Sequence, residues 1–224
     1  MARSFNGSSD TINTANIATV TGSGPWSIAI WCEPAVNSGV VQFAINDGNS
    51  STGMGILPSY SGNSDFLTGI LNGSSFLNGT TQLTLNTWAH LAITCTAAGT
   101  SQLYLNGVAN GSTSGGTPNP TGIVSIGSNG LGTHFFQGCL ADAAVWNTNL
   151  SGGQIATLAA GARANTILPG NLVGYWPLGG TASPEPDLSG NNNNGVLTGT
   201  SFCTDPPQLP PLPGSPVLFA QACL

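Results

Sequence analysis

The chain has 224 residues, and its eight Asp and Glu against two Lys or Arg give a formal net charge of −6 at pH 7. Two cations cannot neutralise a run of phosphates, which excludes nucleic acid and anionic membrane surfaces as electrostatic partners. Charged residues make up only 4% of the chain, so disorder driven by high charge is also excluded, and the 32 glycines favour strands and tight turns.

Short runs of alternating apolar and polar residues are typical of half-buried strands. We predict such strands, in chain order, at Ser27–Cys32, Val40–Ile45, His90–Cys95, Gln102–Leu105 and Gly122–Ile126. Asn-Gly and Asp-Gly dipeptides supply the positive φ that two-residue hairpin turns require. They begin at Asn6, Asp47, Asn72, Asn78, Asn106, Asn110, Asn129 and Asn194. The pattern predicts an all-β protein with antiparallel sheets.

One short helix is expected after these strands. Ser151 followed by Gln154 three residues later is a capping-box pattern, in which each side chain bonds to the backbone N–H of the other residue. The apolar run Ile155–Ala160 continues the helix, and Gly161 is suited to end it.

The composition changes near the C-terminus, which divides the chain into a domain at residues 1–204 and a Pro-rich extended tail at 205–224. Prolines cannot donate to a sheet ladder, so the tail is kept out of central strands. Its apolar stretch Val217–Ala220 would be a liability in water, which predicts an arm that docks on a partner surface.

No apolar stretch approaches the ~20 residues that a membrane helix needs. The first residues, Met1–Gly7, lack the apolar region of a secretory signal. We expect a chain that is made in a cytoplasm or that begins after a removed signal. The five cysteines are expected to be mostly small buried hydrophobic residues, with Cys203 and Cys223 as the pair suspected of forming a disulfide.

Five segments resemble, in order, the strand motifs of one known family. They are Ser4–Ile12, Trp26–Pro34, Asn86–Ala92, Leu103–Gly107 and Phe136–Trp146. The chain thus resembles, over about residues 3 to 200, the laminin-G-like branch of the concanavalin-A-like lectin/glucanase superfamily, of the kind found in phage virion proteins. The resemblance implies an antiparallel jelly-roll β-sandwich with the short helix directly after the last motif.

One part of the resemblance departs from the usual order. Leu172–Leu178 and Asp187–Gly195 resemble a segment that many relatives carry before the first strand, whereas here it follows the last one. Because chain termini often lie close together, we expect this segment to take the same place in the sheet from the other end.

The glucanase relatives hydrolyse glycosides with two carboxylates held at a fixed separation. This chain has only Glu33 and Glu185 as glutamates, and Glu185 falls in a Pro-bearing loop, so we assign no catalytic residue and expect no enzyme. His90 and His134 lack a nucleophile motif, and His90 is expected to be part of the framework.

Some relatives bind calcium through Asp and Asn side chains, so the resemblance makes Asp10, Asp142, Asp187 and Asn191 candidates. Asp187 and Asn191 are the strongest of the four. Each aspartate also suits a structural role in capping a turn or bonding backbone amides, and we therefore expect no cofactor, with calcium as the alternative.

All five tryptophans, Trp26, Trp31, Trp88, Trp146 and Trp176, fall inside the matched motifs and are predicted to be core residues. A sugar-binding site would then have to use aromatic side chains predicted to lie in loops, such as Tyr60 and Phe66, together with loop asparagines.

We expect a non-enzymatic virion surface protein of a bacteriophage, a decoration or head/tail adhesion protein attached through its C-terminal arm. Its partners would be other virion proteins or further copies of itself, with host-surface or mucus glycans as additional ligands. The alternative is a carbohydrate-binding adhesin module of a secreted or cell-surface protein. The nearly uncharged chain and its apolar tail favour the first reading.

Overall fold

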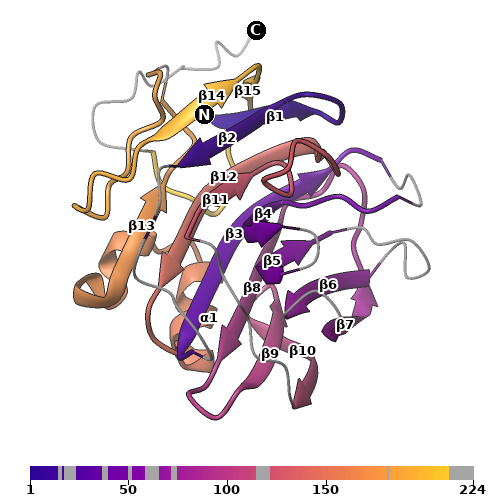
Figure 1. Ribbon diagram of the computed structural model, residues 1–224, viewed down its shortest axis with the longest axis vertical. Helices are drawn as coiled ribbons and strands as arrows, with labels where there is room; N and C mark the ends of the chain where they lie inside the picture. The colour runs from indigo at the N-terminus through magenta and orange to yellow at the C-terminus, as the bar shows by residue number, and fades with distance from the viewer. Residues whose placement is uncertain are drawn as a thin grey trace, which may run out of the picture.

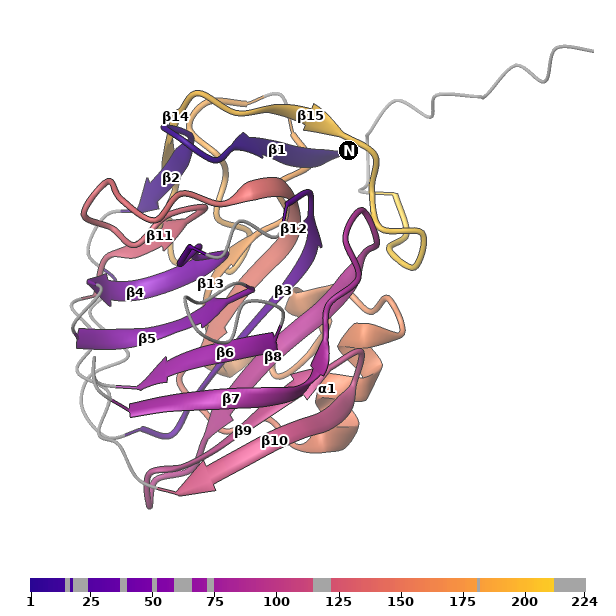
Figure 2. The same ribbon diagram turned by 90° about the vertical axis from the view of Figure 1, so that its right-hand side faces the viewer.

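The structure is a computed structural model that describes residues 1–14, 17, 24–36, 40–49, 52–58, 66–71, 75–114, 122–180 and 182–211. These residues form two antiparallel sheets packed face to face, with one helix on the outer side of one sheet (Figures 1 and 2). The predicted all-β sandwich with one short helix is confirmed.

The first sheet contains the strands with the most burial. Its order is β10 (Val108–Ser114), β9 (Thr100–Leu105), β8 (Ala89–Cys95), β3 (Trp26–Pro34), β12 (Gln137–Trp146), β1 (Ala2–Asn6) and β15 (Ser201–Cys203), with β13 (Leu172–Trp176) also paired to β12. The predicted strands at Ser27–Cys32, His90–Cys95 and Gln102–Leu105 are confirmed as parts of β3, β8 and β9.

The second sheet has the order β14 (Gly195–Thr198), β2 (Thr11–Thr14), β11 (Val124–Ile126), β4 (Ile45–Asn49), β5 (Thr52–Leu57), β6 (Phe66–Leu71) and β7 (Ser75–Gln82). The strand predicted at Gly122–Ile126 is present as β11. The one predicted at Val40–Ile45 is wrong in extent, since β4 begins only at Ile45.

The central strands are buried on both faces, which differs from the half-buried strands expected. Every residue of β8 is buried. One face of β3 and β8 contributes Ile28, Ile30, Leu91 and Ile93 to the main core between the sheets. The opposite face carries Ala29 and Ala92, which the helix covers. Small residues there leave room for the helix to pack closely.

The helix α1 (Gly152–Ala159) has the predicted capping box, with the Ser151 Oγ accepting from Gln154 N and the Gln154 side chain accepting from Ser151 N. Its Ile155 and Leu158 side chains are buried against the first sheet. Gly161 follows the helix with φ +102°. Within the described residues, no helix is long and apolar enough to cross a membrane.

Of the predicted Asn-Gly and Asp-Gly hairpin turns, Asn106-Gly107 is confirmed: it joins β9 to β10, and both residues have positive φ. Three others, at Asp47, Asn78 and Asn110, lie inside β4, β7 and β10, while Asn72-Gly73 falls outside the described residues. At Gly53, opposite Gly48, an added Cβ would lie 2.0 Å from the Asp47 carbonyl oxygen. These glycines therefore permit close approach between strands rather than reversal of the chain.

The C-terminal strands flank the N-terminal ones. β14 pairs with β2, and β15 pairs with β1 with Ala2 opposite Cys203. The N-terminal ammonium of Met1 also contacts the Asp205 carboxylate. The segment after the last family motif thus completes both sheets beside the first strands (Figure 1). That Leu172–Leu178 and Asp187–Gly195 take the place of the relatives' N-terminal segment stays a prediction.

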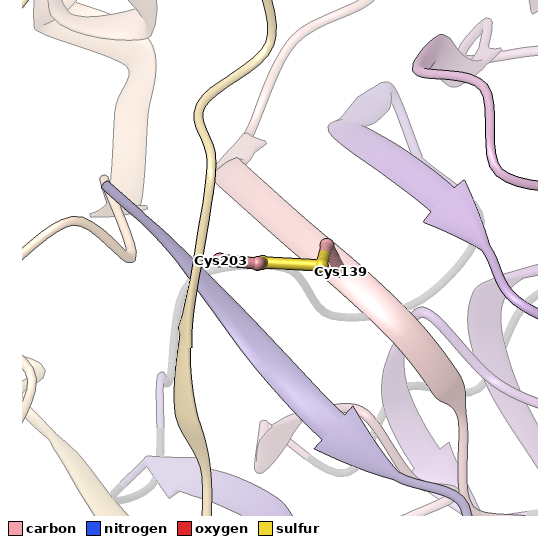
Figure 3. The surroundings of a disulfide bond; sticks show 2 residues. All are labelled: Cys139 and Cys203. Carbon is pink, nitrogen blue, oxygen red and sulfur yellow. A yellow bond between two sulfur atoms is a disulfide. The ribbon is translucent and has the colours of Figure 1, made fainter. Parts of the chain in front are cut away.

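The disulfide partner predicted from the sequence is wrong. Cys203 is bonded to Cys139 on β12, with a Cα–Cα distance of 6.4 Å, and not to Cys223 (Figure 3). Strand β1 lies between β12 and β15 in the sheet order, so two cysteines 64 positions apart come together. Cys32 and Cys95 are buried free thiols, as expected, and Cys223 lies outside the described residues.

The start of the predicted tail packs on the domain. Leu209 is buried in a small cluster with Ala2, Trp31 and Ala141 on the outer face of the first sheet. The Arg163 guanidinium donates to the Pro210 carbonyl oxygen. The boundary at residue 204 stays a prediction, but residues 205–211 do not stand apart from the sandwich. The stretch Val217–Ala220 lies outside the described residues.

Candidate functional site

Most of the tryptophans are core residues, as predicted. Trp26, Trp31, Trp146 and Trp176 are buried, and the Trp146 indole nitrogen donates to the Ile167 carbonyl oxygen at 2.9 Å. Trp88 differs, since it is only partly buried, against the cluster that contains Trp31 and Leu209.

The aromatic residues expected in loops do not form a described sugar platform. Tyr60 lies outside the described residues, and Phe66 begins β6 instead of lying in a loop, with its side chain outside the described set. A sugar site that uses these two side chains therefore stays a prediction, and the described residues offer a separate candidate.

The two glutamates have separate environments. Glu185 is fully buried, and its Oε2 accepts from the Arg3 Nη2 at 2.9 Å while its Oε1 accepts from Leu178 N. Burial raises the pKa of the Glu185 carboxyl, although Arg3 acts in the opposite direction. Glu33 is partly exposed on β3 and lines a cavity. These roles do not match a pair of carboxylates that share a substrate.

Asp187 is held by four donors. Its Oδ1 accepts from Tyr175 N and Ser189 N, each at 2.9 Å, and its Oδ2 accepts from Ser189 Oγ at 2.8 Å and Asn193 N at 2.9 Å. These bonds use all four lone-pair directions of the carboxylate. The arrangement fixes the loop after β13 and does not fit a calcium ion.

Asn191 lies near Asp187 through their shared neighbour Ser189, but its amide nitrogen faces the protein. It donates to the Leu172 carbonyl oxygen at 3.0 Å and the Val173 carbonyl oxygen at 3.3 Å. Calcium takes about six to eight oxygen ligands, so the one side-chain oxygen of Asn191 does not make a site by itself. No group of three or more His, Cys, Asp or Glu positioned to hold a metal occurs among the described residues.

The other two calcium candidates also have protein partners and lie in different places. Asp10 accepts from Asn6 N at 3.1 Å. Asp142 Oδ1 accepts from the Tyr175 hydroxyl at 2.6 Å and from Arg163 Nη1 at 2.8 Å. Burial raises the pKa of the Asp142 carboxyl more than these donors lower it.

His90 is a framework residue, as expected. It is 2% exposed, and its ring meets Trp31 edge-on at a centroid distance of 5.3 Å. Burial lowers the pKa of His90 to about 3, so the ring is neutral in the folded protein at neutral pH.

The β1–β2 turn lies beside the connection between β11 and β12 (Figure 2). Residues of these segments take part in lining two neighbouring cavities. The first, of about 400 Å³, includes Asn6, Glu33, Asn86 and Gln137 in its lining. The second, of about 360 Å³, is lined by Gly7, Ser8, Val40, Val41, Gln42, His134, Phe135 and Gln137. We call the two cavities together the rim cleft.

Gln137 lines both halves of the rim cleft. An added Cβ on Gly7 would lie 2.9 Å from the Gln137 Cβ, so the glycine lets the turn pack directly against this side chain. Gln137 N donates to Gln42 Oε1 at 3.1 Å, and Gly7 N donates to the Phe136 carbonyl oxygen at 3.0 Å. These bonds hold the three chain segments of the cleft together.

Three polar side chains in the first half are available to a ligand. The Glu33 carboxylate and the side-chain amides of Asn86 and Gln137 make no hydrogen bond with any residue in the described part of the chain. A carboxylate accepts hydrogen bonds, and an amide both donates and accepts them. This set can pair with hydroxyl groups of either polarity.

The bonds of Asn129 set the tautomer of His134. The Asn129 Oδ1 accepts from Leu131 N and Thr133 N, each at 3.1 Å, which fixes the direction of its amide. The Asn129 Nδ2 therefore donates to His134 Nδ1 at 2.9 Å. In neutral His134 the remaining proton is then on Nε2, which is left as a donor. His134, which takes part in lining the second half of the cleft, thus carries one ring N–H donor.

Apolar side chains accompany these polar groups. Val40 is 56% exposed and lines the cleft with the partly buried Val41 and Phe135. Sugar-binding sites combine a few directed polar groups with apolar surface against the ring C–H groups. The sequence reasoning missed this site, because its residues come from strand ends and loops that are far apart in the sequence. The Asn6-Gly7 dipeptide was the nearest signal.

The comparisons with known proteins bear on the fold. A family model described as "Concanavalin A-like lectin/glucanases superfamily" matches residues 6–156. No curated protein sequence matches the chain. A structure from Bacteroides ovatus ATCC 8483, described as a carbohydrate binding protein, is 18% identical with a TM-score of 0.72. That similarity covers 89% of this chain and 58% of the other, so this chain spans little more than half of its relative.

Two further structures are similar over less of the chain. The heptameric SAP-like pentraxin from Limulus polyphemus is 18% identical with a TM-score of 0.57, covering 73% of this chain and 83% of that one. Domain 4 of AbnA, a GH43 extracellular arabinanase from Geobacillus stearothermophilus solved with arabinotriose, is 20% identical with a TM-score of 0.58. The similarity covers 70% of this chain and 76% of that domain. At these identities the similarity establishes the sandwich fold.

Proposed function

The chain belongs to the concanavalin A-like lectin/glucanase superfamily, and from that premise we propose that it is a non-catalytic carbohydrate-binding protein whose rim cleft receives the sugar. The observation that carries the proposal is the lining of the cleft. There a carboxylate and two amides with no hydrogen-bond partner in the described part of the chain lie near exposed or partly buried apolar side chains. Domain 4 of the arabinanase, with its bound arabinotriose, supports the choice of ligand class by analogy of fold.

The absence of catalysis is part of the proposal. Hydrolysis of a glycoside by the common mechanism needs an acid and a second carboxylate on the two sides of the scissile bond. Glu33 is the one carboxylate among the described residues that line the rim cleft, and Glu185 is buried in its ion pair with Arg3. A bound glycan would therefore be retained and not cleaved.

Retention on immobilised polysaccharides tests the proposal. Affinity electrophoresis in gels containing arabinan, xylan, mannan, galactan or β-glucan should show retardation by at least one polymer. Gln137→Ala should weaken that retardation about tenfold or more, since it removes hydrogen bonds from both halves of the cleft. Gln82→Ala is the matched control, because Gln82 is exposed on β7 and lines neither half.

Two outcomes would overturn the proposal. One is mobility that no polysaccharide changes. The other is retardation that Gln137→Ala leaves at the wild-type level while the variant stays folded, because the sugar would then bind elsewhere. Release of reducing sugar from a retained polymer would overturn the non-catalytic part alone.

A second candidate is a structural protein on a virion surface that associates with other virion proteins or with its own copies. A disulfide between Cys139 and Cys203 supports a protein that functions outside a reducing cytosol, as virion and cell surfaces both allow. Mass spectrometry of purified particles, with culture medium and cell envelope in parallel, tests it. Recovery only from the medium or the envelope would overturn the virion role and favour a secreted or cell-surface adhesin.

A further inference from the structure

The cations of the chain limit which glycans the rim cleft can bind. The sequence contains two arginines and no lysine, and the structure describes both arginines. Arg3 is buried, and its guanidinium donates to the Glu185 carboxylate and to the carbonyl oxygens of Gly180 and Ala182. Its donors are thus engaged inside the protein.

Arg163 is engaged in the same way. Its Nη1 donates to Asp142 Oδ1 at 2.8 Å, and its Nη2 donates to the Pro210 carbonyl oxygen. Neither arginine contributes to the lining of the rim cleft. Of the side chains with a permanent positive charge, none therefore faces a ligand in the rim cleft.

The cleft instead presents a negative charge. Glu33 lies opposite Cys139 in the register of β3 and β12, beside the amides of Asn86 and Gln137. Its carboxylate forms no ion pair within the described part of the chain. A carboxylate of this kind accepts hydrogen bonds from sugar hydroxyls, whereas a uronate or sulfate group on the ligand would be repelled by it.

Building on the proposed function, we infer that the rim cleft selects neutral glycans, with Glu33 accepting from the hydroxyls of one sugar ring, and that it rejects glycans carrying carboxylate or sulfate. The net charge of −6 acts in the same direction over longer distances. Glu33 is thereby the specificity-determining residue of the site.

Matched oligosaccharides test this inference. Calorimetric titrations at pH 8 compare β-1,4-linked glucan, mannan and galactan trimers with the same trimers oxidised to carboxylates at C6. We expect a neutral trimer to bind about tenfold or more tightly than its oxidised counterpart. Raising the salt concentration should leave the affinity for the neutral trimer unchanged. It should raise the affinity for the oxidised trimer, because salt screens the repulsion between the ligand carboxylates and Glu33.

Glu33→Gln assigns the selectivity to one residue. The substitution keeps the shape of the side chain and one acceptor oxygen, so the affinity for the neutral trimer should fall only several-fold. The ratio of the affinities for the neutral and the oxidised trimer should fall toward one. Thermal melting checks that the variant is folded. Asp205→Gln removes one negative charge outside the cleft and should keep the wild-type selectivity, which separates a local effect from net charge.

The outcomes separate this inference from the proposed function. Equal binding of neutral and oxidised trimers, or full selectivity retained in Glu33→Gln, would overturn the inference and leave carbohydrate binding intact. Tighter binding of oxidised trimers would do the same. Failure of every neutral and oxidised trimer, together with unchanged mobility in all the polysaccharide gels, would overturn the proposed function itself.

Discussion

The guanidinium of Arg3 and the carboxylate of Glu185 form a buried ion pair at 2.9 Å across 182 positions of sequence. The pair joins the first strand to the loop between β13 and β14 and so fixes the place where the C-terminal strands complete both sheets. A charge left alone at such a position is costly, because water cannot solvate it there.

The ion pair gives the first prediction. Arg3→Met should lower the free energy of unfolding by about 3–5 kcal/mol, since it leaves the Glu185 carboxylate buried without its partner. The double variant Arg3→Met/Glu185→Leu should recover much of that loss, because both charges are removed together. Urea unfolding of the two variants measures the difference. A loss below about 1 kcal/mol in Arg3→Met would contradict the assigned role.

His90 predicts a dependence of stability on pH. Its pKa is lowered from 6.5 to about 3 by burial, so the unfolded chain takes up a proton that the folded chain does not. This contribution to the free energy of unfolding is complete above pH 6.5 and is lost as the pH falls toward 3, by up to about 1.4 kcal/mol per pH unit.

His90→Phe tests that dependence, because phenylalanine fills the position beside Trp31 without titrating. Between pH 6.5 and pH 4 the wild type should lose about 3 kcal/mol more than the variant. Urea unfolding at several pH values gives the free energy of unfolding against pH for the wild type and for the variant. Parallel curves across this range would show that the histidine does not control the acid response.

The Cys139–Cys203 bond predicts sensitivity to reductant. It closes a loop of 64 positions, and by the chain-entropy estimate its removal lowers the free energy of unfolding by about 4 kcal/mol. The double variant Cys139→Ala/Cys203→Ala should melt at the temperature of the reduced wild type and should not respond to reductant. Alkylation of unfolded, unreduced protein should modify Cys32 and Cys95 and leave the bonded pair unmodified. Modification of all four would contradict the pairing.

Leu209 predicts that the beginning of the C-terminal segment supports the domain. Leu209→Ala should lower the free energy of unfolding by about 2 kcal/mol, since the side chain is buried against Ala2 and Trp31. Gln208→Ala, at an exposed neighbouring position, is the control and should leave the melting temperature nearly unchanged. Equal melting of both variants and wild type would indicate that this segment only rests on the surface.

The sequence was informative wherever a local pattern determines a local structure. The alternation in Ser27–Cys32 identified β3, and the spacing of Ser151 and Gln154 identified the cap of α1. Burial on both faces of β8 was not predictable in this way, because it depends on the helix that packs against the outer face.

The disulfide and the rim cleft depend on contacts distant in sequence. Cys139 meets Cys203 only because the sheet order places β1 between their strands. The cleft combines the turn after Asn6 with residues near Gln42 and His134, and none of these segments carries a sugar-binding signal alone. The calcium candidate Asp187 could be located in its loop, but its four donors could not be foreseen.

The most direct test of the central claim is a titration of the ¹⁵N-labelled protein with a retained neutral oligosaccharide, followed by backbone amide chemical shifts. We predict that the shifts concentrate on the rim cleft, at Asn6–Ser8, Gln42 and His134–Gly138, and that Gln137→Ala reduces them at equal ligand concentration. Shifts confined instead to the cavity beside α1, around Gln102, Tyr104 and Ser151, would contradict the account.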